Sequence, residues 1–161
     1  MYKHTILILS MLFILCFAST LTLSQTYGEI FTSAEANEKF GPVLISVTLS
    51  TSYLKQLLNK TDKYIMFKVV EDKAIILDNN RNLLHPTVKI INPTDVFKVF
   101  SISVVNELLS SGLNANVFIE QRNSVLSVSS GDLTMEVGVL CPPWCPDDDD
   151  GDGVMATIDN N

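Results

Sequence analysis

The feature that most constrains the fold is a match of the chain with itself at an offset of 51 residues. The offset aligns residues 50–58 with 101–109, Pro42 with Pro93, Phe67 with Phe118, and the polar turn 71–73 with 122–124. The matches run through the whole unit without a gap. The chain is therefore predicted to contain two copies of one supersecondary unit, at about residues 42–92 and 93–140.

Both units have the same predicted order of elements. Apolar runs at residues 43–49 and 96–100 are rich in β-branched and aromatic residues, which is typical of strands. Ser50 and Ser101 then cap short helices, with Gly112 as the C′ residue of the second helix. The apolar positions of these helices recur at helical spacing: Leu54, Leu57 and Leu58, then Val105, Leu108 and Leu109. Strands follow at 64–70, 74–77 and 82–84, and at 116–121, 125–128 and 133–139.

This order predicts an α+β fold: internally duplicated β-α-β-β-β units forming a mainly antiparallel sheet, with the helices on one face. A short N-terminal helix is expected from Ser33 to Phe40, because Thr32 and Glu35 form a capping box and Gly41-Pro42 ends it. The order of elements is similar to that of DNA sliding-clamp domains. That resemblance implies an architecture and no function.

The N-terminus predicts export. A short basic start precedes the apolar run 5–17, and small residues follow, so residues 1–24 are expected to be a signal peptide. The alternatives are an uncleaved anchor and a lipidated Cys16. Cleavage after Ser24 leaves 137 residues, of which 25–140 form the duplicated domain and 141–161 the tail, with no membrane span in the mature chain. The expected location is secreted, periplasmic or at the cell surface.

After cleavage the remaining cysteines are Cys141 and Cys145, and an even pair in an exported chain favours a disulfide. The alternatives are a redox pair and free thiols. Charge is concentrated in the tail, because six of the 18 acidic residues lie in the last 15 positions. The rest of the mature chain has no excess of basic residues, so nucleic acid is not an expected partner.

The acidic tail has the spacing of a twelve-residue calcium loop. Counted from Asp148, oxygen-bearing side chains fall at positions 1, 3, 5 and 12, and Gly153 falls at position 6. The predicted ligands are the side chains of Asp148, Asp150, Asp152 and Asp159 and the carbonyl of Val154. Calcium is the expected cofactor. The alternative is a solvated acidic tail that keeps the chain soluble.

Residues 148–160 resemble one thrombospondin type 3 repeat, a calcium-binding class of extracellular proteins. The resemblance implies the same ligand positions. Ala156 departs from the pattern, since the family usually has an acid or amide there. The family works in tandem arrays, whereas this chain has one copy, so binding is expected to be weak, at ~10⁻⁴ to 10⁻³ M.

The expected function is a secreted or surface, non-catalytic binding module with a calcium loop, and its partner is an unknown protein or glycan. The chain is expected not to be an enzyme, because no spacing of residues singles out a catalytic set. The alternatives are a structural linker protein leading into a calcium array, and a small secreted hydrolase. The hydrolase would use His85 or a pair of carboxylates.

Overall fold

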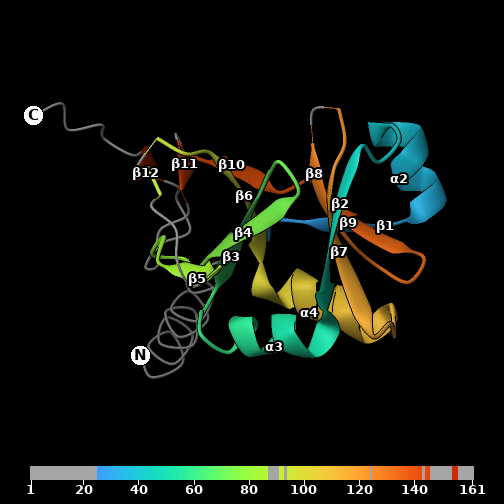
Figure 1. The fold of residues 1–161 in the computed structure, drawn as a ribbon, viewed down its shortest axis with the longest axis horizontal. Helices are drawn as coiled ribbons and strands as arrows, with labels where there is room; N and C mark the ends of the chain where they lie inside the picture. Colours follow the sequence, from blue (N-terminus) through green and yellow to red (C-terminus); the bar gives the residue numbers. More distant parts are fainter. Residues whose placement is uncertain are drawn as a thin grey trace, which may run out of the picture.

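The structure is a computed structural model that describes residues 25–86, 91–92, 94–123, 125–142, 144–145 and 154–155. The predicted signal peptide lies outside the described residues. In the described part no helix has the length and apolar character needed to cross a membrane. This part has an α+β fold with three helices, two antiparallel five-stranded sheets and a short strand pair (Figure 1).

The helices are α2 (Ser33–Phe40), α3 (Thr51–Leu58) and α4 (Ile102–Ser111). The first sheet has the order β1-β9-β8-β7-β2, and the second has the order β10-β6-β3-β4-β5. The strands of the first sheet are β1 (Glu29–Thr32), β2 (Ile45–Ser50), β7 (Asn116–Gln121), β8 (Leu126–Ser130) and β9 (Leu133–Glu136). Those of the second are β3 (Tyr64–Val70), β4 (Lys73–Leu77), β5 (Leu83–His85), β6 (Phe97–Ser101) and β10 (Val139–Cys141). The remaining pair is β11 (Trp144–Cys145) with β12 (Val154–Met155).

The fold class agrees with the sequence, but the strands form two sheets where one was expected. Strand β2 pairs with β7, aligning Thr48 with Phe118, and β6 pairs with β3, aligning Phe100 with Ile65. A strand that precedes one helix therefore joins the strands that follow the other helix. Hydrophobic patterning sets which side of a strand is buried, but it does not select the strand's neighbour.

The expected strand 133–139 is interrupted. Val137 has a φ of 61°, which a β-branched residue rarely adopts, and β9 ends just before it. The next residue, Gly138, lies so close to β6 that a Cβ there would be 2.4 Å from the carbonyl oxygen of Val99. The chain thus crosses from the first sheet to the second, where β10 begins.

The helix caps agree with the sequence in part. The Ser50 hydroxyl accepts a hydrogen bond from the Tyr53 N–H (3.2 Å), as expected of an N-cap. At the start of α4, Ser101 makes no side-chain cap; its hydroxyl accepts the Tyr27 N–H instead (2.8 Å). Gly112 is the C-cap with right-handed backbone angles, so the expected C′ role was wrong.

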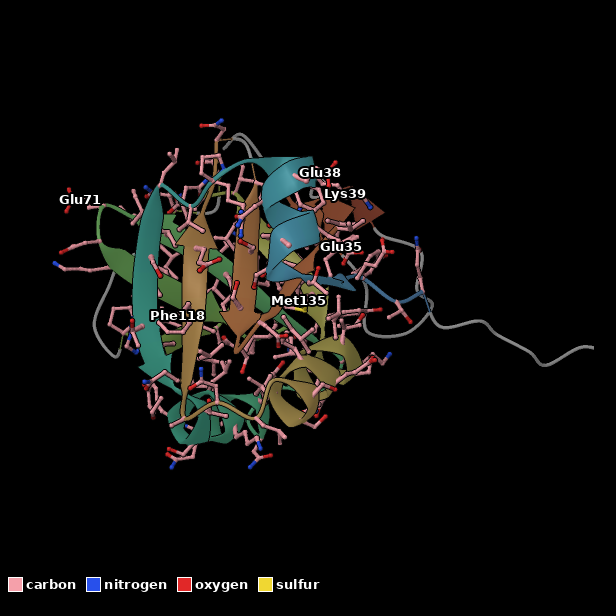
Figure 2. The ribbon with its side chains drawn as sticks, turned by 90° about the vertical axis from the view of Figure 1, so that its right-hand side faces the viewer. Glu35, Glu38, Lys39, Glu71, Phe118 and Met135 are labelled. Atoms are coloured by element: carbon pink, nitrogen blue, oxygen red, sulfur yellow. A yellow bond between two sulfur atoms is a disulfide. The ribbon has the colours of Figure 1, made fainter. Side chains whose placement is uncertain are left out.

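Two apolar clusters hold the fold together. The larger lies between the sheets and against α3 and α4, which lie next to each other at one end in both views (Figures 1 and 2). It includes the apolar helix positions picked out in the sequence, all of which are buried: Leu54, Leu57, Leu58, Val105, Leu108 and Leu109. The smaller cluster covers the other face of the second sheet and includes Tyr27, Met66 and Cys141.

Helix α2 covers part of the outer face of the first sheet, with Glu35, Glu38 and Lys39 on the helix (Figure 2). It spans the range predicted from the capping box, and both capping hydrogen bonds are present. Ala36 is fully buried, and the ring of Phe31 on β1 packs edge-on against Phe40. This helix closes over a group of buried polar residues.

Candidate functional site: a pocket between the two sheets

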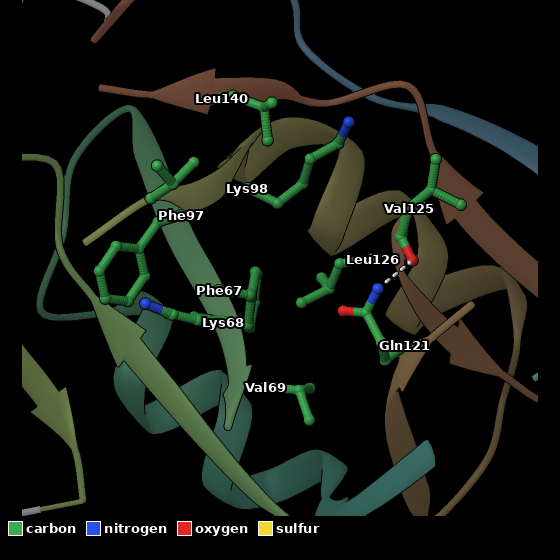
Figure 3. Close-up of a pocket in the computed structure, with 10 residues that line it drawn as sticks. Phe67, Lys68, Val69, Phe97, Lys98, Gln121, Val125, Leu126 and Leu140 are labelled. Carbon is green, nitrogen blue, oxygen red and sulfur yellow. Dashed lines mark hydrogen bonds between the residues drawn. The ribbon is translucent and has the colours of Figure 1, made fainter. Parts of the chain in front are cut away.

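A pocket of about 240 Å³ opens between the sheets. Strand β3 follows α3 in the chain, and strand β7 follows α4. Both strands lead away from the helices, so the pocket residues near their C-terminal ends lie at a distance from the helices. The pocket is shown in Figure 3 and is lined by Phe67, Lys68, Val69, Val96, Phe97, Lys98, Gln121, Val125, Leu126 and Leu140. Both sheets contribute to it.

The pocket has an apolar floor and an apolar rim. Phe67 is fully buried at the floor, and Leu126 is nearly so. Val96 and Leu140 at the rim are 44% and 53% exposed. Since covering apolar surface is worth about 25 cal/mol per Å², a ligand that reached both floor and rim would be stabilised by contacts with them.

Gln121 supplies a hydrogen-bond acceptor whose orientation is determined by its neighbours. Its Nε2 donates to the main-chain oxygens of Arg122 (2.8 Å) and Val125 (3.2 Å). Because both partners are acceptors, they must face the amide nitrogen, and flipping the amide would break both bonds. Figure 3 shows the Oε1 atom turned into the hollow, and this atom accepts no hydrogen bond from the described residues.

Lys98 supplies the positive charge of the pocket. Its side chain is partly buried and runs beside Leu140 (Figure 3). Burial lowers the pKa of Lys98, and the attraction of Glu136 opposes that shift. No carboxylate of the described residues lies within 4.0 Å of its Nζ atom. By contrast, Lys68 is engaged with Asp95 at 2.6 Å.

A buried polar cluster joins α2 to the first sheet. Its centre is Arg122, which is 2% exposed. The guanidinium donates to Asn37 Oδ1 (2.7 Å), to the main-chain oxygen of Gly41 and to Ser127 Oγ (3.1 Å). Glu120 lies 3.4 Å from the same guanidinium. These contacts attach the end of α2 to β7 and β8.

Glu136 is the unusual member of this cluster. Its side chain has no exposed surface, its Oε1 lies 3.5 Å from Arg122 Nε, and neither carboxyl oxygen has a hydrogen-bond partner. Burial raises the pKa of Glu136 to about 7, opposed by the Ser127 hydroxyl, which lies nearby without hydrogen-bond geometry, and by the positive charges of Arg122 and Lys98. Glu120 raises it further.

Acid–base chemistry can use a pair of neighbouring carboxylates, and Glu120 is close enough to Glu136 to interact with it electrostatically. A substrate must also reach both groups, and Glu136 has no exposed surface. His85 of the hydrolase alternative contacts Tyr53, whose hydroxyl lies 3.1 Å from His85 Nδ1. Burial lowers the pKa of His85.

The predicted calcium ligands Asp148, Asp150, Asp152 and Asp159 lie outside the described residues. Val154 is in β12, aligned with Cys145. The calcium loop therefore stays a prediction. Cys141 and Cys145 form a disulfide, as expected, with their Cα atoms 4.6 Å apart.

Sequence reasoning missed Lys98 and Gln121, and it gave no reason to choose Glu136 from the scattered carboxylates Glu71, Glu107, Glu120 and Glu136. The available signal was alternation within strands, since Lys98 shares a strand face with Phe100, and Gln121 shares one with Ile119. A polar residue on the buried face of a strand marks a position to inspect. Compared with known proteins, the chain matches no family model, no curated protein and no solved structure.

Proposed function

We propose that this protein is an exported, non-catalytic binding module that holds part of its partner in the pocket between the two sheets. The observation that carries the proposal is that two polar side chains, Lys98 and Gln121, line a pocket whose other walls are largely apolar. Ligand sites typically combine apolar walls with a few polar groups that set orientation. The partner is a protein or glycan outside the producing cell or on its surface.

Export is proposed from the apolar N-terminal segment and is supported by the disulfide between Cys141 and Cys145. Disulfides persist mainly in oxidising compartments. The proposed locations are the extracellular medium, the periplasm and the cell surface. Mass spectrometry of the protein from the culture medium or cell envelope should find a chain that begins near Gln25; an intact Met1 would contradict the signal peptide.

We also propose that residues 42–92 and 93–140 arose by duplication. The order β2-α3-β3-β4-β5 is repeated as β6-α4-β7-β8-β9. The exchange of first strands is reciprocal, since β2 pairs with β7 and β6 pairs with β3. In a crystal structure of the protein, rotating one unit onto the other should superpose all five elements in order. A superposition that fails beyond the helix and its following strand would contradict the duplication.

The calcium loop is proposed as a second feature of the module, placed after the disulfide. Its proposed ligands are Asp148, Asp150, Asp152, Asp159 and the Val154 carbonyl. The spacing of the oxygens and the position of Gly153 support it. Calcium would then order the C-terminal end of an exported protein.

The pocket is tested by a fragment screen of mature residues 25–161, read by amide chemical-shift changes. Fragments that bind should shift the signals of Lys98, Gln121 and Leu140. Val69→Trp places a larger ring at the pocket wall and should abolish those shifts, while Leu113→Trp, at an 87% exposed position, should not. Hits that cluster elsewhere, or hits unaffected by Val69→Trp, would refute this site.

A further inference from the structure

The pocket presents three complementary requirements to a ligand. The Lys98 ammonium would pair with a negative group of the ligand, and the Gln121 Oε1 atom would accept a hydrogen bond from a donor of the ligand. An apolar group of the ligand would pack against the side chains of Phe67, Val69 and Leu126. A ligand that meets all three carries an anion, an N–H and a hydrocarbon.

The last residue of a peptide has this chemistry. We propose that the pocket binds the C-terminal residue of a partner protein whose last side chain is apolar. In this proposal, which rests on the proposed function, the terminal carboxylate pairs with Lys98 and the main-chain N–H of that residue donates to Gln121 Oε1. Its side chain enters the apolar floor.

The acceptor at Gln121 separates this ligand from a simple fatty acid. A carboxylate at neutral pH has no proton to donate, so a fatty acid would leave the oriented Oε1 atom without a partner. Covering an acceptor without a hydrogen bond loses the bond it made to water, which disfavours binding. A peptide N–H satisfies it.

The charges favour a single negative group. Lys68 is engaged with Asp95, so Lys98 is the pocket cation left for the ligand. The electrostatic neighbour of Lys98 is Glu136, whose carboxyl would repel a doubly charged phosphate when ionised. A terminal carboxylate carries one charge and can accept from the ammonium in a charge-assisted hydrogen bond.

The size of the pocket fits one residue. Pockets for drug-sized ligands typically have about 300–1,000 Å³, so a pocket of 240 Å³ suits a smaller group, such as one terminal amino-acid residue. The exposed rim residues Val96 and Leu140 would contact the residue before it, and the chain would leave through the open mouth.

The experiment is a titration of mature residues 25–161 with three small probes, followed by amide chemical shifts. The probes are N-acetyl-leucine, N-acetyl-leucinamide without the carboxylate, and 4-methylpentanoate without the N–H. We expect N-acetyl-leucine to bind at least about tenfold more tightly than either of the others, because the amide loses the ion pair with Lys98 and the pentanoate leaves Gln121 Oε1 without a donor. The shifts should centre on Lys98 and Gln121.

Lys98→Met should weaken N-acetyl-leucine by about tenfold or more and leave N-acetyl-leucinamide nearly unchanged. Lys98→Arg should restore most of the binding, and Lys55→Met, which changes an exposed lysine on α3, should have no effect. The three-probe comparison needs only the unaltered protein, so it holds even if a variant fails to fold.

Equal binding of N-acetyl-leucine and 4-methylpentanoate would overturn the proposal and identify a simple apolar carboxylate as the ligand. Equal binding of N-acetyl-leucinamide would overturn the role of Lys98. If none of the probes binds but other fragments shift the same residues, the C-terminal ligand is refuted and the binding pocket stands. If nothing binds there, both are refuted.

Discussion

Replacing Glu136 with glutamine should stabilise the protein above neutral pH. The raised pKa means that the folded protein binds a proton at Glu136 more tightly than the unfolded chain does. Between about pH 4.5 and 7 the folded state therefore holds more protons, and the free energy of unfolding falls as pH rises through that window. Above about pH 7 the folded protein contains an ionised Glu136 carboxylate that has no hydrogen-bond partner.

The size of the change in unfolding free energy follows from the pKa shift of Glu136. Raising the pKa from 4.5 to about 7 corresponds to roughly 3 kcal/mol of stability lost at pH 8, since one unit is about 1.4 kcal/mol. The shift already includes the attractions of Arg122 and Lys98. Glutamine resembles the protonated acid in shape, so Glu136→Gln should gain most of this free energy at pH 8 and little at pH 4.5.

Urea denaturation of mature residues 25–161 at several pH values would measure the effect. The quantity to compare is the difference in unfolding free energy between Glu136→Gln and the unaltered protein. This difference removes the contribution of His85, whose lowered pKa makes stability rise with pH in an overlapping window. Glu38→Gln on the exposed side of α2 serves as the matched control and should show no such trend.

A Glu136→Gln protein that is destabilised equally at pH 5 and pH 8 would refute the reasoning. That result would mean that Glu136 is ionised throughout and stabilises Arg122 by its charge. The same conclusion would follow from a carboxyl carbon signal of Glu136 that titrates near pH 4. A gain at pH 8 that vanishes on acidification would support the buried neutral carboxyl.

Three further predictions concern the fold and the tail. Gly112→Ala should cost about 1–3 kcal/mol in urea denaturation, because its Cβ would lie 2.5 Å from the Ser130 carbonyl oxygen; unchanged stability would contradict that close approach. Thr32→Ala should lose about 1 kcal/mol with the α2 cap, measured in the same way, and no loss would mean that the cap adds nothing. Asp150→Ala combined with Asp152→Ala should abolish the heat of calcium binding in calorimetric titration, and an unchanged isotherm would refute the loop.

Local structure was readable from the sequence because it depends on neighbours along the chain. The spacing of Leu54, Leu57 and Leu58 predicted α3 and its buried side, and the capping box of Thr32 and Glu35 predicted α2. Each pattern reflects contacts within about one turn of helix, so no distant residue was needed. Apolar runs joined by polar turns predicted most strands from local sequence as well.

The sequence by itself therefore determined the three helices, most of the strands and the buried side of α3 and α4, but neither β1 nor the break between β9 and β10. Tertiary structure alone decided that β2 pairs with β7 and that the chain leaves the first sheet at Val137. It also placed Lys98 beside a pocket shared with Gln121, 23 positions later in the sequence. Strand pairing and burial of charge depend on which distant segments meet, and local propensity carries no information about that choice.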